Sequence, residues 1–109
     1  MDNNSELGKT FAHLVATELK GAITARGFTV AQVCEQIGTY PTTFSRYFAG
    51  KRSMTLDTFY AVCAVIGIEP AEIADRATKR METETPATYS TKDTYVRDYT
   101  EAARSRKTE

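Results

Sequence analysis

The sequence is poor in the residues that build metal centres, disulfide frameworks and enzyme active sites. It has no tryptophan, one histidine and two cysteines in 109 residues. The single histidine, His13, supplies neither a multi-ligand zinc site nor a catalytic triad. Cys34 and Cys63 do not stand in a metal-ligand or C-x-x-C spacing. No motif pairs carboxylates at catalytic spacing, so we expect no enzyme activity, no metal, no cofactor and no small-molecule ligand.

Long apolar runs and net charge are lacking as well. No stretch approaches the roughly 18–20 apolar residues that span a bilayer, and no signal-peptide pattern opens the chain. We therefore expect a cytoplasmic protein without a membrane partner. The 14 basic residues balance the 14 acidic ones. This balance excludes a protein that coats nucleic acid through bulk charge, but it allows one that binds nucleic acid through a local patch.

The distribution of charge contains such a patch. Between Glu35 and Asp57 there is no acidic residue, whereas Arg46, Lys51 and Arg52 are basic. Taken alone, a few cations in a window of this length indicate only a solvated loop. Whether these three cations form a binding site therefore depends on the secondary structure in which they lie.

Helical periodicity divides the first 81 residues into short helices. Residues 1–10 are polar and predict a loose start, and apolar positions recur at helical spacing from Thr10 onward. Glycine, proline or a capping threonine stands at the expected boundaries. The expected helices are 10–26, 29–37, 41–49, 55–66 and 70–81. The predicted fold class is therefore all-α, a compact five-helix domain over residues 1–81.

Residues 82–109 differ from this domain in composition. Residues 82–91 are rich in threonine and poor in aliphatic side chains, so we expect a polar linker. Beyond it, Tyr95, Val96 and Tyr99 begin a narrow apolar stripe that suits a helix over about 92–105. Two interpretations remain open here. The tail is either a marginal, frayed helix, or an arm that docks on the core or on a second subunit to form a homodimer.

The segments 29–37 and 41–49 are joined by three residues, Gly38-Thr39-Tyr40. A three-residue turn that contains glycine is typical of a helix-turn-helix. Phe44 and Tyr47 lie on one face of the second helix, where they can pack against the rest of the domain. The opposite face then presents small polar residues and one arginine, and such a surface fits the major groove of DNA.

This geometry predicts which side chains contact DNA. Arg46 can make a bidentate contact with guanine O6 and N7, worth roughly 1–3 kcal/mol of discrimination. Lys51 and Arg52 follow the helix where flanking phosphates would run, and the helix N-terminus at Thr29 can hold another phosphate. The predicted DNA-binding residues are Thr29, Tyr40, Pro41, Thr42, Thr43, Ser45, Arg46, Lys51 and Arg52.

Several stretches of the sequence resemble the lambda-repressor/Cro-type helix-turn-helix family. GFTVAQVCEQIG at 27–38 is similar to the opening of that motif, and TYPTTFSRYFAG at 39–50 continues it through the recognition helix. Residues 51–60 and 66–73 are similar to the family's fourth and fifth helices. The resemblance covers about residues 11–78. It implies a five-helix DNA-binding domain that works as a dimer on a near-palindromic operator.

The sequence departs from the family pattern at three positions. Val30 stands where the family often has glutamine, and Pro41 stands where it often has glutamine or arginine. Phe48 replaces an acidic residue that is common near the end of the recognition helix. These departures leave fewer polar side chains for base contacts and place more of the recognition on Arg46 and the threonines.

Aromatic residues of the expected helices 41–49 and 55–66 have two possible roles, as core or as a base-stacking platform. Single-strand binders usually expose aromatics on a sheet, and no strand pattern is present, so we expect core packing. We likewise expect Cys34 and Cys63 to be buried, reduced thiols. The aromatic residues expected in the core are Phe44, Tyr47, Phe48, Phe59 and Tyr60.

Three functional hypotheses follow. The leading one is a sequence-specific double-stranded DNA-binding regulator, a repressor of phage or bacterial type whose helix 41–49 enters the major groove. The second is a protein-interaction module, such as an antitoxin-like or anti-regulator partner, motivated by the neutral net charge and the missing polar side chains. The third is an architectural or recombination accessory protein that bends DNA.

Overall fold

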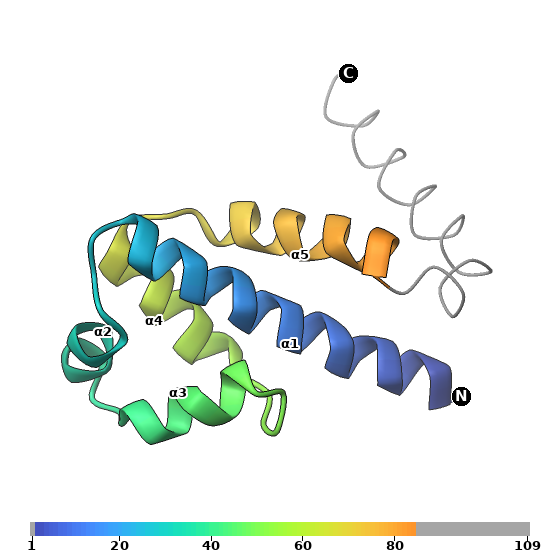
Figure 1. The fold of residues 1–109 in the computed structure, drawn as a ribbon, viewed down its shortest axis with the longest axis horizontal. Helices are drawn as coiled ribbons and strands as arrows, with labels where there is room; N and C mark the ends of the chain where they lie inside the picture. The colour runs from blue at the N-terminus through green and yellow to red at the C-terminus, as the bar shows by residue number, and fades with distance from the viewer. Residues whose placement is uncertain (1, 85–109) are drawn as a thin grey trace, which may run out of the picture.

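The computed structural model describes residues 2–84, and the regular structure in this range is entirely helical. α1 and α5 run antiparallel side by side, α4 lies behind α1, and α2 and α3 form the lower edge in Figure 1. This arrangement confirms the expected all-α domain of five helices. Their bounds are α1 (Asp2–Ala25), α2 (Val30–Ile37), α3 (Pro41–Phe48), α4 (Leu56–Ile66) and α5 (Pro70–Glu84).

The core is apolar and receives side chains from all five helices. Among the described residues, no polar or charged residue is buried. Each large aliphatic or aromatic side chain that is withdrawn from water stabilises the fold by about 1.5–3 kcal/mol. Side chains without solvent exposure include Leu19 and Ile23 of α1, Val33 of α2, Phe44 of α3, Val62 of α4 and Ile73 of α5.

The helices α1 and α5 are longer than the sequence predicted. α1 begins at Asp2, so the loose start expected for residues 1–10 is wrong. α5 continues to Glu84, so residues 82–84, expected in a linker, are helical. Leu7 packs against the core, so the extension of α1 has an apolar contact that local composition does not reveal, and the extension of α5 continues the helix beyond the buried Met81. The expected linker at 85–91 and the tail helix lie outside the described residues.

One face of α4 is exposed to solvent. Val62, Cys63 and Ile66 are buried, whereas Leu56 and Tyr60 are 82% and 64% exposed. The prediction that Tyr60 belongs to the core is therefore wrong. The sequence of α4 is apolar on most sides, but the other helices cover only part of this apolar surface.

Arg26 links the end of α1 to the end of α4. α1 ends at Ala25, and the guanidinium of Arg26 donates a hydrogen bond of 2.7 Å to the carbonyl oxygen of Gly67. The guanidinium therefore lies at the C-terminus of α4, where free carbonyl groups carry partial negative charge.

Cys34 and Cys63 are both about 1% exposed and form no disulfide. Burial raises the pKa of each thiol above its ordinary value, because the charged thiolate is poorly solvated inside the core. The prediction of buried, unpaired cysteines is confirmed. At a given pH, each raised pKa reduces the fraction of reactive thiolate.

We therefore expect both cysteines of the native chain to react slowly with a maleimide or a disulfide reagent at pH 8. The rate should be at least ~10-fold lower than for the same chain in urea, because the folded state limits both access and thiolate formation. The measurement is mass spectrometry of labelled protein over time. Labelling of the native chain as fast as the unfolded chain would contradict the burial of these thiols.

Candidate nucleic-acid interface

The start of α2 is fixed by the capping box that the sequence predicted. The hydroxyl oxygen of Thr29 accepts a hydrogen bond of 3.1 Å from the backbone N–H of Gln32. In return, the side-chain oxygen of Gln32 accepts a bond of 2.9 Å from the backbone N–H of Thr29. Thr29 is exposed, and its hydroxyl proton stays available because the oxygen acts only as an acceptor in the box.

The turn between α2 and α3 is short and rigid. Gly38 ends α2 with φ of 76°, in the left-handed region where other residues cost about 1–2 kcal/mol. The backbone N–H of Thr39 donates to the carbonyl of Cys34, and Pro41 occupies the first turn of α3. Pro41 fits there because its missing N–H has no partner at a helix start. The turn therefore sets the direction of α3.

Aromatic packing holds the inner face of α3 in place. Phe44 is fully buried and Tyr47 is buried, as the sequence predicted. The ring centroids of Phe44 and Tyr47 lie 5.3 Å apart, and those of Phe44 and Phe48 lie 5.8 Å apart, both in edge-to-face geometry. Each such aromatic pair stabilises the fold by about 0.5–1.5 kcal/mol in addition to the contribution of its buried surface area. α3 therefore cannot rotate to bury its other face.

The C-terminal end of α3 is tied to α1 through Phe48. The Nε2 atom of His13 donates a hydrogen bond of 2.9 Å to the carbonyl oxygen of Phe48. The ammonium group of Lys20 lies 5.3 Å from the centroid of the Phe48 ring, within the range of a cation–π contact. Phe48 thus makes structural contacts at a position where the family often has an acidic residue.

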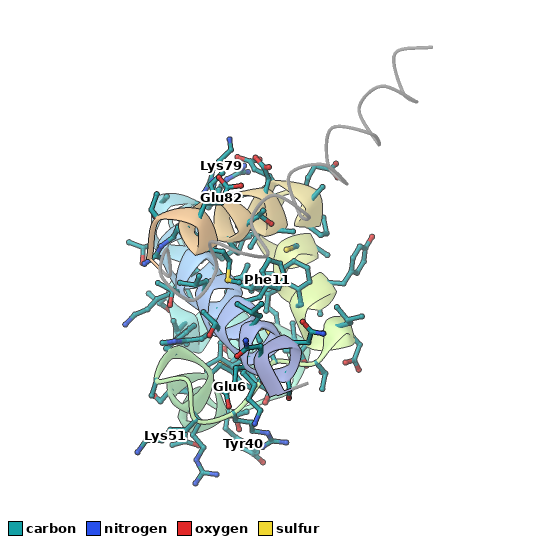
Figure 2. All side chains as sticks on the ribbon, turned by 90° about the vertical axis from the view of Figure 1, so that its right-hand side faces the viewer. Glu6, Phe11, Tyr40, Lys51, Lys79 and Glu82 are labelled. Atoms are coloured by element: carbon teal, nitrogen blue, oxygen red, sulfur yellow. The ribbon has the colours of Figure 1, made fainter. Side chains whose placement is uncertain are left out.

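The outer face of α3 is open to solvent. Tyr40 is 73% exposed, and Figure 2 shows it at the same end of the molecule as Lys51, opposite Lys79 and Glu82 of α5. Thr43 is half-buried at the margin of this face. The other predicted DNA-binding residues are all exposed, namely Thr29, Pro41, Thr42, Ser45, Arg46, Lys51 and Arg52.

The cations at this end of the molecule are not neutralised within the described part of the chain. The side chains of Arg46, Lys51 and Arg52 make no hydrogen bond or ion pair with residues 2–84. By contrast, Arg76 and Lys79 of α5 each pair with a carboxylate one turn earlier on their helix. Within residues 2–84, three cations without a carboxylate partner therefore lie on α3 or directly after it.

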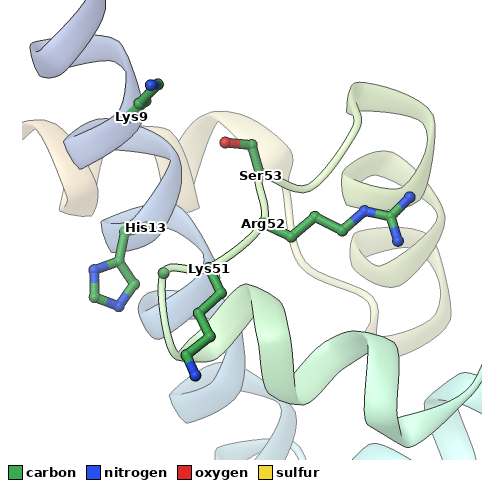
Figure 3. Close-up of a pocket in the computed structure, with 6 residues that line it drawn as sticks. Lys9, His13, Lys51, Arg52 and Ser53 are labelled. Atoms are coloured by element: carbon green, nitrogen blue, oxygen red, sulfur yellow. The ribbon is translucent and has the colours of Figure 1, made fainter.

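The loop after α3 directs its two cations differently. Gly50 has φ of 77°, and the backbone N–H of Lys51 donates to the carbonyl of Arg46, which ends the helix. Figure 3 shows the Lys51 and Arg52 side chains leaving this loop in different directions. Both residues were predicted to contact flanking phosphates. Their different directions allow Lys51 and Arg52 to reach separate phosphates.

Two residues near this loop were not among the predicted site residues. Lys9 and His13, one turn apart on α1, line a pocket together with residues 50–53. Neither residue belongs to the helix-turn-helix from which the site residues were predicted. The only feature of the local sequence that pointed to a site here was the spacing of Lys9 and His13 on one helix face. The loop at 50–53 is distant in sequence, and the tertiary fold brings it close to them.

Searches for other kinds of site give negative results within residues 2–84. No group of three or more histidine, cysteine, aspartate or glutamate side chains could hold a metal ion there. No helix in the same range has the length and apolar character needed to cross a membrane.

Comparison with known proteins identifies the family. Searches of curated proteins and of solved structures give no match. Residues 18–79 match the family model of the Cro/C1-type HTH DNA-binding domain, which includes the turn, α3 and every predicted DNA-binding residue. The match spans more than half of the chain and agrees with the five-helix fold. The chain therefore belongs to the Cro/C1-type helix-turn-helix DNA-binding family.

Proposed function

We propose that this protein is a sequence-specific regulator of transcription, a repressor of phage or bacterial type that acts in the cytoplasm of a bacterial cell. The observation that carries this proposal is the division of α3 into a buried aromatic face and an exposed face with Arg46, which has no partner within residues 2–84. Repression would follow from occupation of a promoter by the bound protein.

In this mechanism, α3 enters the major groove. Some of the exposed side chains contact bases and others contact phosphates. Arg46 contacts a guanine through O6 and N7, with Thr42 and Thr43 beside it on neighbouring bases. Tyr40 and Pro41 lie at the start of the helix, where small or flat surfaces allow the backbone to approach the bases. The residues assigned to phosphates are Thr29, Ser45, Lys51 and Arg52.

We also propose that the protein binds a near-palindromic site as a homodimer held by its C-terminal tail. The tail carries the apolar stripe of Tyr95, Val96 and Tyr99. Sedimentation of the full chain and of a chain truncated after Thr85 tests this idea. The truncated chain should sediment as a monomer, and an unchanged dimer would assign the contact to the helical domain instead.

Selection of bound duplexes from a random library, followed by footprinting, tests the function itself. We expect an enriched motif whose footprint is centred on the major groove. The absence of any enriched motif at low salt would contradict the proposal. It would favour the alternative of a protein-interaction module, antitoxin-like or anti-regulator, that keeps the fold without specific DNA binding.

Arg46 and Lys51 should differ in how their loss affects binding. Arg46→Ala should relax the preference at one base pair by roughly 1–3 kcal/mol. Lys51→Ala should weaken binding to all sequences alike and lower the slope of log K against log salt by about 1. Binding titrations on matched and mismatched duplexes at several salt concentrations measure both effects.

Lys79→Ala serves as the control for these variants, because Lys79 pairs with Asp75 on α5, at the opposite end of the molecule. It should leave the affinity and the salt slope unchanged. Equal losses on all duplexes for Arg46→Ala and Lys51→Ala would refute the division between base and phosphate contacts.

Substitutions of Thr29 separate its role in folding from its role in binding. Thr29→Ala removes the cap and should lower the free energy of unfolding by about 1 kcal/mol. Thr29→Asp keeps an effective cap but places a negative charge where we expect a phosphate. It should retain stability in urea titrations and weaken binding to every duplex. Wild-type affinity in Thr29→Asp would exclude a phosphate at this position.

A further inference from the structure

A small basic pocket lies beside the C-terminal end of α3, between α1 and the loop that leads to α4 (Figure 3). We propose that this pocket holds a phosphate group of the DNA backbone, so that the DNA interface extends onto the N-terminal half of α1. The inference rests on the proposed function and adds a contact to it. The residues that line the pocket are Lys9, His13, Gly50, Lys51, Arg52 and Ser53.

The size and chemistry of the pocket suit a small anion. Its volume is about 230 Å³, below the roughly 300–1,000 Å³ of sites for drug-sized ligands. Its lining residues include three that are cationic, a histidine and a serine, but no acidic residue, although the guanidinium of Arg52 extends away from Lys9 and His13 in Figure 3. The cations Lys9, Lys51 and Arg52 form no ion pair within residues 2–84. Glu6, one turn before Lys9, does not line the pocket.

The fold holds the two walls of the pocket close together. A Cβ atom at Gly50 would lie only 3.2 Å from the Cγ and Nδ1 atoms of His13, so the loop approaches α1 as closely as a glycine allows. The φ of 77° at Gly50 also favours glycine. The hydrogen bond from His13 to the carbonyl of Phe48 fixes the imidazole ring against α3. The cavity is therefore a built feature of the domain.

The loop also supplies main-chain donors. The backbone N–H groups of Arg52 and Ser53, and the hydroxyl of Ser53, make no hydrogen bond within the described part of the chain. Successive free N–H groups in a turn are well suited to bind the oxygen atoms of an anion. Together with the ammonium group of Lys9, they would give a phosphate both charge compensation and hydrogen bonds.

The pocket joins residues inside the family match to residues outside it. Gly50, Lys51, Arg52 and Ser53 belong to the matched range 18–79, whereas Lys9 and His13 precede it. Lys51 borders both the end of α3 and the pocket, so a DNA strand that passes Lys51 can also place a phosphate in the pocket. Lys9 would then contact DNA although it lies well before the helix-turn-helix in the sequence.

Lys9→Ala in the full chain tests this inference, and it should fold normally because alanine favours a helix. On the selected duplex and on a random duplex alike, we expect several-fold weaker binding and a salt slope lower by about 0.9. The base preference should be unchanged. Lys79→Ala is the matched control and should behave as the wild type.

Titration of the folded chain with inorganic phosphate, without DNA, gives a second measurement. NMR should show shifts of the Arg52 and Ser53 amide signals, and these shifts should weaken in Lys9→Ala. A wild-type salt slope for Lys9→Ala would overturn the proposal, even if Arg46→Ala still relaxes base preference and so supports the proposed function. Failure of the wild type to bind any duplex would overturn both, and phosphate-induced shifts would then identify a site for free anions.

Discussion

The burial of the aromatic face of α3 is the interaction on which the rest of the interface depends. An isolated helix of eight residues is unstable in water, because its few hydrogen bonds do not offset the cost of nucleation. Phe44 and Tyr47 supply the missing stability by packing into the core. Since these two side chains allow only one rotation of α3, they also determine that Arg46 and the hydroxyl side chains face outward. Stability therefore uses one face of this short helix, and the proposed base contacts use the opposite face.

The distribution of ion pairs explains how a chain without net charge can bind DNA. Arg76 and Lys79 are compensated by carboxylates on α5, and Arg80 lies 3.3 Å from Glu18 of α1. These contacts neutralise cations on the side away from α3. The cations beside α3 remain uncompensated within residues 2–84, and no acidic residue lies between Glu35 and Asp57. A local field of this kind acts on DNA at short range, where the net charge of the whole chain matters little.

The parts of the structure that the sequence predicted well are those determined by local chemistry. The capping box at Thr29, the turn at Gly38 and the helix start at Pro41 each depend on residues within a few positions, and all are present in the structure. The errors concern contacts between distant segments. The contact of Leu7 with the core accompanies the longer α1. The exposure of Tyr60 depends on which side of α4 is covered, and the pocket at Lys9 requires the approach of a distant loop.

The departures from the family pattern also bear on the choice between a DNA-binding protein and a protein-interaction module. Pro41 fits the first turn of α3, and Phe48 anchors the end of that helix through His13 and Lys20. Both substitutions therefore strengthen the framework that presents α3. A surface that had lost its DNA-binding role would have no need for a helix with small outward side chains and an Arg46 that has no partner within residues 2–84. In the proposed mechanism, the missing polar groups leave fewer side chains for base contacts, and the exposed face of α3 that such contacts need is retained.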